Sequence, residues 1–277
     1  MKNLLSKSSA NVQLINFHNP NMRTLLIAVL SLFTLATNSS IVAQVPARND
    51  RVIIKPGTIV IVRSGKLVKD FPEKKRAVIK YPIVTGLSDP IVLRRVRSTL
   101  QIKNVFDTSV AEYRQDTWLA EFGYEVNYNK NYILDITFSQ DGSAAYPDSQ
   151  TKHFAINLKT GGLIKASDAF VASQLPALAD LVKAKFQAEL KQILIDLAES
   201  KSDAEDIRIA KEAQEALEFK PSDIDDFSIG DKGVTFLYDA GYPHAIQAFE
   251  PEGRYFFSYA ELKPFIKQDG PLGQFVK

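Results

Sequence analysis

The chain has 277 residues, 45% of them hydrophobic and 10% aromatic, which is enough to bury one or two hydrophobic cores. It contains no cysteine, which excludes disulfides, thiolate chemistry and Cys-ligated metal sites. Its 34 basic and 32 acidic residues nearly balance, and no nucleic-acid-binding motif is present, so we expect no nucleic-acid partner.

The charge is unevenly distributed along the chain. Residues 48–100 hold 13 basic and 4 acidic residues, whereas residues 101–277 hold 18 basic and 28 acidic ones. A basic surface of this kind meets an anionic wall polymer or a membrane surface, or it pairs with the acidic half of the same chain. We favour pairing within the chain.

The N-terminus has the pattern of an export signal. A positive charge at Arg23 precedes the apolar run Leu25–Ala36, and small residues follow at Ala43 and Ala47. We therefore predict that residues 1–47 are a signal peptide, with translation beginning at either Met1 or Met22. Cleavage would leave a periplasmic or secreted protein without a stable membrane anchor. The alternative is an uncleaved anchor, although the run is short for a spanning helix.

The first elements after residue 47 are short strands. Residues 51–54 and 58–62 are rich in β-branched side chains and flank a Lys-Pro-Gly turn, so residues 48–76 form a short β-rich segment. A further strand is predicted at 77–84. Ser88 or Asp89 can cap a helix that begins near Pro90 and continues through apolar residues at helical spacing.

The middle of the chain predicts an antiparallel hairpin. Residues 119–129 and 132–139 alternate in polarity on either side of an Asn-Lys-Asn turn. A loop of small residues follows at Asp141–Pro147, and a strand is predicted at His153–Leu158. We interpret the loop as a recognition loop and His153 as a half-buried packing residue.

Helical periodicity dominates residues 178–217, with a strong apolar stripe up to Leu197 and a weaker one after it. We interpret this stretch as a helical insertion. The tail returns to strands, including one at Ala245–Phe249, and Ser258 with Glu261 forms a capping box for a last short helix. The predicted fold class is α+β: an antiparallel sheet with helices packed on one face, plus the insertion.

Motifs of known chemistry are absent from the sequence. There is no Gly-x-Ser-x-Gly elbow, no phosphate-binding glycine loop and no zinc spacing around His153 or His244. We therefore expect no metal, no cofactor and no catalytic residues. One alternative remains, because Asp141 and Asp148 bracket the loop and glycosidases use two carboxylates.

Two aromatic loop motifs are the candidate binding residues. Tyr146-Pro147 and Tyr242-Pro243-His244 each place an amphipathic ring beside a restricted backbone. Rings of this kind contribute large contact area at low entropic cost, and they stack on sugar faces. The alternative is that each tyrosine only covers the edge of a sheet.

Several short stretches occur together in an order that resembles the RsiV-like domain of unknown function. They are Tyr81–Pro82, Gly86–Asp89, Tyr124–Asn129, Leu134–Phe138, Ser143–Pro147, Phe154–Gly161 with Leu163 and Asp168–Phe170, and Phe257–Phe265. The resemblance covers about residues 77–266, so we assign residues 77–277 to this domain, with the insertion at about 178–217. The family pattern at the loop contains a histidine, where this chain has Tyr146.

The resemblance implies an α+β module that senses or binds in the cell envelope. Domains of this type form the ectodomain end of RsiV-type anti-sigma factors, whose ligand is lysozyme, and they precede the catalytic domain of PdaC-type peptidoglycan deacetylases. We carry over neither sigma regulation nor deacetylation. The predicted function is an exported, non-catalytic binding or sensing module for a lysozyme-like wall hydrolase or for peptidoglycan. The alternative is an envelope hydrolase acting on glycan through Asp141 and Asp148.

Overall fold

The computed structural model describes residues 50–143, 146–200 and 202–277. All of them belong to one compact unit, Arg48–Lys277. The predicted signal peptide, and residues Ala144 and Ala145 of the predicted loop, therefore lie outside the described residues. Among the helices in the described ranges, none is long and apolar enough to cross a membrane.

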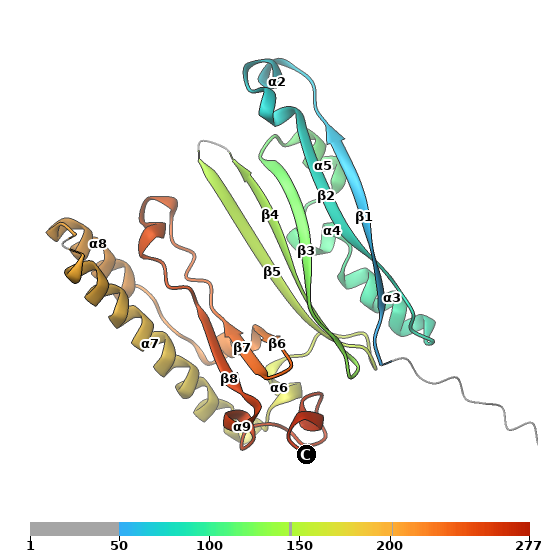
Figure 1. Ribbon diagram of the computed structural model, residues 1–277, viewed down its shortest axis with the longest axis vertical. Helices are drawn as coiled ribbons and strands as arrows, with labels where there is room; N and C mark the ends of the chain where they lie inside the picture. Colours follow the sequence, from blue (N-terminus) through green and yellow to red (C-terminus); the bar gives the residue numbers. More distant parts are fainter. Residues whose placement is uncertain (1–49, 144–145, 201) are drawn as a thin grey trace, which may run out of the picture. The chain divides into compact units, whose positions relative to one another are not determined.

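The larger sheet has five strands in the order β1-β2-β3-β4-β5 (Figure 1). They are β1 (Ile53–Val62), β2 (Arg76–Thr85), β3 (Leu119–Lys130), β4 (Ile133–Ser143) and β5 (Pro147–Asn157). Neighbouring strands are antiparallel except β2 and β3, which run parallel. The α+β class is confirmed, but the prediction of a wholly antiparallel sheet is wrong for this pair.

The parallel pair is explained by the segment that joins it. Parallel neighbours need a crossover connection, because both strands run in the same direction. Three helices form it: α3 (Pro90–Thr99), α4 (Ile102–Phe106) and α5 (Val110–Gln115). Helix α3 begins where the sequence predicts, because the Asp89 carboxylate accepts hydrogen bonds from the backbone amides of Ile91 and Val92 at 2.8 and 3.2 Å.

The crossover helices and one face of the larger sheet enclose the first hydrophobic core. The helices contribute Val92, Val96, Val105 and Tyr113. The strands contribute Ile61, Ala77, Ile79, Val84, Leu119, Phe122, Leu134, Ile136, Phe138, Phe154 and Ile156. Helices therefore pack on this face, as predicted.

A second, three-stranded antiparallel sheet lies in the C-terminal half, in the order β6-β7-β8. Its strands are β6 (Phe227–Ile229), β7 (Gly233–Leu237) and β8 (Arg254–Ser258). Helix α7 (Leu175–Glu199) packs on this sheet, and α8 (Ala204–Glu215) packs on α7 (Figure 1). The apolar side chains of α7 and of this sheet form the second core, together with α6 (Ala166–Ala169) and α9 (Tyr259–Leu262).

The remaining elements are short. They are α2 (Lys66–Asp70) and the 3-10 helices η1 (Pro72–Lys75), η2 (Ala172–Gln174), η3 (Pro221–Asp225), η4 (His244–Phe249) and η5 (Gly273–Phe275). The strand predicted at Ala245–Phe249 is therefore wrong, because this stretch is η4. The capping box of Ser258 and Glu261 is confirmed at the start of α9.

Strand β4 joins the two cores, because it is buried on both faces. Leu134, Ile136 and Phe138 point into the first core, whereas Ile133 belongs to the second. Side chains alternate along a strand, so Asp135 lies on the same face as Ile133. An acidic residue, completely buried, is therefore placed where the larger sheet meets the second core.

Candidate functional site

The structure brings the two predicted aromatic motifs together. Tyr146 immediately precedes β5, and His244 begins η4 in the connection between β7 and β8. Their rings stack with centroids 4.7 Å apart and planes inclined by 21°. Tyr146 is nevertheless 64% exposed, so one face of its ring remains open to a ligand.

These residues line a groove of about 380 Å³. We call it the aromatic groove, and its lining residues are Trp118, Tyr146, Pro147, Asp148, Tyr242, His244 and Gln247. Four of the five predicted binding residues thus share one concave site. The fifth, Pro243, precedes η4 and does not line it.

Close backbone packing positions Trp118 in the groove. Ser143 donates its backbone N–H to the Trp118 carbonyl at 3.0 Å. A Cβ atom on Gly142 would lie 2.3 Å from that carbonyl oxygen and 2.6 Å from the indole Cδ2. The absence of a side chain at Gly142 therefore lets the end of the β4–β5 hairpin lie directly against Trp118.

Tyr242 lines the aromatic groove and carries a buried hydroxyl. Its backbone N–H donates to the Glu250 carboxylate at 3.2 Å. Its phenolic oxygen is buried, and no described residue forms a hydrogen bond with it. Burial, together with the charge of Glu250, raises the pKa of Tyr242, so the hydroxyl stays protonated at neutral pH. A buried hydroxyl without a protein partner is uncommon.

The two carboxylates of the hydrolase alternative do not converge. Asp148 lines the aromatic groove, whereas Asp141 does not. In the β4–β5 ladder Gly142 is opposite Asp148, and Asp141 is opposite Ser149. Residues directly opposite share a face and consecutive residues alternate, so the side chains of Asp141 and Asp148 lie on opposite faces of the sheet.

Sequence reasoning missed Trp118 and Gln247. Trp118 is the single tryptophan of the chain, which was a usable signal. Nothing in the sequence marked Gln247 as a binding residue, because it lies in the stretch that was predicted to be a strand. The 3-10 turn of η4 brings it to the groove.

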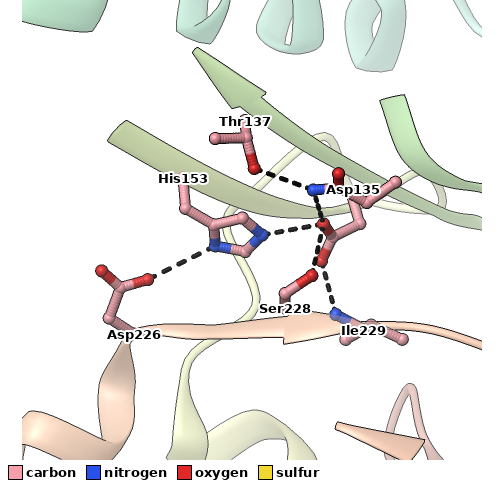
Figure 2. A network of polar contacts seen from close by, with 7 residues as sticks. Asp135, Thr137, His153, Asp226, Ser228 and Ile229 are labelled. Carbon is pink, nitrogen blue, oxygen red and sulfur yellow. Dashed lines mark hydrogen bonds and ion pairs between the residues drawn. The ribbon is translucent and has the colours of Figure 1, made fainter. Parts of the chain in front are cut away.

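A buried polar network around Asp135 is the second site of interest (Figure 2). The Asp135 carboxylate accepts hydrogen bonds from His153 Nε2 at 2.8 Å, from Ser228 Oγ at 3.0 Å and from the Ile229 backbone N–H at 2.6 Å. Asn127 Nδ2 donates to it as well, at 2.7 Å. The network therefore fastens β4 and β5 of the larger sheet to β6 of the smaller one.

His153 is held between two carboxylates in this network. Its Nδ1 lies 3.3 Å from Asp226, which immediately precedes β6, and its side chain is only 5% exposed. Burial alone would lower the pKa of His153, but the hydrogen bonds and charges of Asp135 and Asp226 outweigh it and raise the pKa to about 9. The residue as a whole is half-buried, as expected from the sequence, but its ring is shielded and forms a cation in a polar network rather than a packing group.

This geometry does not suit catalysis. Both ring nitrogens of His153 face carboxylates, so neither is available to remove a proton from a nucleophile. Ser228 Oγ contacts Asp135 and has no bond to the histidine. Within the described residues, no group of three or more His, Cys, Asp or Glu side chains is arranged to hold a metal ion.

Comparison with known proteins identifies the fold. No protein-family profile matches the sequence, and no curated protein does. A crystal structure of a DUF3298 family member from Bacteroides fragilis NCTC 9343 aligns with 83% of this chain and 99% of its own, with a TM-score of 0.52 and 13% identity. A DUF3298 family protein from Pseudomonas aeruginosa PAO1 aligns with 78% of this chain and 94% of its own, with a TM-score of 0.47 and 14% identity.

The likeness to the Bacteroides structure concerns the fold alone. DUF3298 denotes a domain of unknown function, so the comparison adds no ligand and no reaction. It is compatible with the resemblance to the RsiV-like domain, which stays a prediction.

Proposed function

We propose that the protein is an exported, non-catalytic module that binds or senses a component of the cell envelope at the aromatic groove. The observation that carries this proposal is the convergence of Tyr146, Tyr242 and His244 with Trp118 in one concave site. Ligand sites combine apolar and aromatic walls with a few polar groups that fix orientation. Asp148 and Gln247 are groups of that kind.

Peptidoglycan is the ligand class that this chemistry fits best. The exposed ring face of Tyr146 offers a flat apolar platform to the C–H face of a pyranose ring. The carboxylate of Asp148 and the amide of Gln247 match the hydroxyl and acetamido groups of a wall glycan. A lysozyme-like wall hydrolase is the second candidate, because Tyr146 also protrudes at the end of a hairpin, as interface anchors do.

The hydrolase alternative lacks the geometry that it needs. Both glycosidase mechanisms require two carboxyl groups that flank one glycosidic bond. Asp141 and Asp148 lie on opposite faces of the sheet, and only Asp148 reaches the groove. A binding function needs no such pair.

The test measures binding and stability of the same variants. We expect the protein to bind purified peptidoglycan or a lysozyme, measured by sedimentation with sacculi and by titration with soluble muropeptides or the enzyme. Tyr146→Ala and His244→Ala should each weaken binding about fivefold to thirtyfold, which is roughly 1–2 kcal/mol. The free energy of unfolding should change by no more than about 0.5 kcal/mol, because both side chains are exposed.

Phe71→Ala is the matched control, because Phe71 is an exposed aromatic residue outside the groove. It should leave binding to both probes unchanged. If the protein bound neither peptidoglycan nor a lysozyme, the proposed function would be wrong. Equal losses of binding and stability in Tyr146→Ala would mean that Tyr146 only packs against His244.

A further inference from the structure

The connection between β1 and β2 carries a concentrated positive charge. Residues 62–76 contain six basic and two acidic residues, and we call this segment the basic tip. It includes α2 and η1 and lies at the end of the β1–β2 hairpin (Figure 1). The two acidic residues, Asp70 and Glu73, offset only part of its charge.

Ion pairs with the acidic half of the chain do not neutralise this charge. Lys66, Lys69, Lys75 and Arg76 are exposed, and within the described ranges no carboxylate lies within 4.0 Å of their charged groups. Among the basic residues in the described part of 48–100, only Lys80 forms an ion pair, with Glu121 at 2.6 Å. The expectation that the basic segment pairs with the acidic half is therefore wrong for these residues.

Large apolar side chains are exposed among these cations. Val62 is 69% exposed and Phe71 is 50% exposed. Each sits within a few residues of a lysine or arginine in the sequence. Neighbouring cations and exposed apolar side chains suit an interface that is anionic at its surface and apolar beneath it.

The basic tip is fixed to the rest of the fold. The buried Arg63 side chain donates to the carbonyl oxygens of Lys74, Tyr113 and Leu119 at 3.0, 3.0 and 2.9 Å. Lys74 Nζ in turn donates to Ser143. Because the tip is already ordered, docking it on a surface would cost little conformational entropy.

We propose that the basic tip docks the protein peripherally on an anionic phospholipid surface. Lys66, Lys69, Lys75 and Arg76 contact the lipid headgroups, and Phe71 with Val62 enters the boundary between headgroups and acyl chains. Charge complementarity and the exposed apolar side chains together favour a membrane over a hydrated anionic polymer, which has no apolar layer to receive Phe71. None of these docking residues lines the aromatic groove, so the proposal does not depend on the ligand of the groove.

The test is sedimentation with vesicles of phosphatidylcholine alone, and with vesicles containing about a third phosphatidylglycerol. The chain beginning at Arg48 is used, because it contains both hydrophobic cores and lacks the apolar run Leu25–Ala36. We expect binding to the anionic vesicles only, and weaker binding as salt screens the charges. A soluble anionic polymer, polyglutamate, should compete poorly.

Two sets of variants distinguish the local charge of the basic tip from the net charge of the protein. Replacing Lys66, Lys69 and Lys75 together by Glu should reduce vesicle binding at least tenfold. The control replaces the exposed Lys183, Lys191 and Lys211 by Glu, which changes the net charge equally and should reduce binding less than threefold. Phe71→Ser should weaken binding severalfold, whereas Ile91→Ser, at a residue that is 58% exposed elsewhere, should not.

Circular dichroism melting identifies any variant that fails to fold, and Phe71→Ser and the salt series then carry the test. Equal losses in the two lysine sets would overturn the proposal. So would equal binding to neutral and anionic vesicles, no binding to either, or polyglutamate competing as well as the vesicles.

Discussion

His153 Nε2 lies 2.8 Å from the Asp135 carboxylate, and both side chains are almost completely shielded from solvent. The contact joins β5 to β4, and the other contacts of Asp135 continue to β6. A charged pair of this kind stabilises the folded protein only while the histidine is protonated. The link between the two sheets should therefore respond to pH.

The first prediction concerns this pH dependence. The pKa of His153 is raised from 6.5 to about 9 in the folded protein. Its contribution to stability should be complete below about pH 6.5 and lost as pH rises through 9, by roughly 3 kcal/mol in all. Denaturant unfolding between pH 6 and 10 measures it. In His153→Gln this loss should be absent, whereas the exposed His244→Gln should unfold like the wild type. A pH profile of His153→Gln parallel to that of the wild type would contradict the assignment.

The sequence predicts local structure better than it predicts this network. The Asp89 cap, the β3–β4 hairpin and the Ser258 capping box depend on neighbouring residues, and the structure confirms them. The turn of the hairpin lies at Asn131 and Tyr132 rather than at 129–131, because Asn129 and Lys130 still pair with β4. In the sequence, Asp135 is a polar residue of an alternating strand, and such a residue normally faces water. Only the β6 segment, far along the chain, covers that face and buries the carboxylate.

Two other differences have separate causes. The parallel arrangement of β2 and β3 could have been predicted, because the helix capped by Asp89 separates the two strands, and such a connection usually returns a strand parallel to the first. The proximity of Tyr146 and His244 could not, because the two residues lie in connections that belong to different sheets. Because both motifs contain a Tyr-Pro pair, the sequence suggested that each binds a ligand. Only the fold shows that they line the same groove.

Export is the second prediction. The apolar run Leu25–Ala36, followed by Ala43 and Ala47, motivates it. Expression of the full sequence in a bacterial host should yield a soluble envelope protein whose N-terminus is near Gln44 or Arg48. N-terminal sequencing checks this. Recovery of residues 1–40 in a membrane-bound protein would favour the uncleaved anchor.

The third prediction concerns the glycine that lies against Trp118. Gly142→Ala should destabilise the protein by roughly 1–3 kcal/mol, because the new Cβ would overlap the backbone carbonyl of Trp118. It should also weaken ligand binding, because Trp118 must shift. Gly123→Ala is the control in the same pair of strands, since its Cβ would meet only Ser139 Oγ at 3.6 Å. Equal melting temperatures for the two variants would show that the contact imposes no constraint.

The last prediction concerns helix α8, which supports the groove more than the core. Its buried side chain is Ala210, and its Gln214 donates to the Leu190 carbonyl of α7 at 3.0 Å. It also contacts η4, the segment that carries His244 and Gln247. Replacing residues 200–215 by a short Gly-Ser linker should therefore cost only about 1–2 kcal/mol of stability, because the one buried side chain of α8 is small and belongs to neither core, and loop length matters little.

The same deletion should affect binding more strongly than stability. Without α8, η4 loses a packing partner, so His244 is held less firmly against Tyr146, and the groove must be ordered when the ligand binds. We expect affinity for the groove ligand to fall at least tenfold while a cooperative thermal transition persists. Arg208→Ala is the matched control, because its ion pairs with Glu205 and Glu212 lie within α8 and are exposed. Arg208→Ala should change neither the affinity for the ligand nor the thermal stability. Full affinity in the deletion would mean that η4 keeps its position without α8, and loss of the thermal transition would mean that α8 belongs to the core.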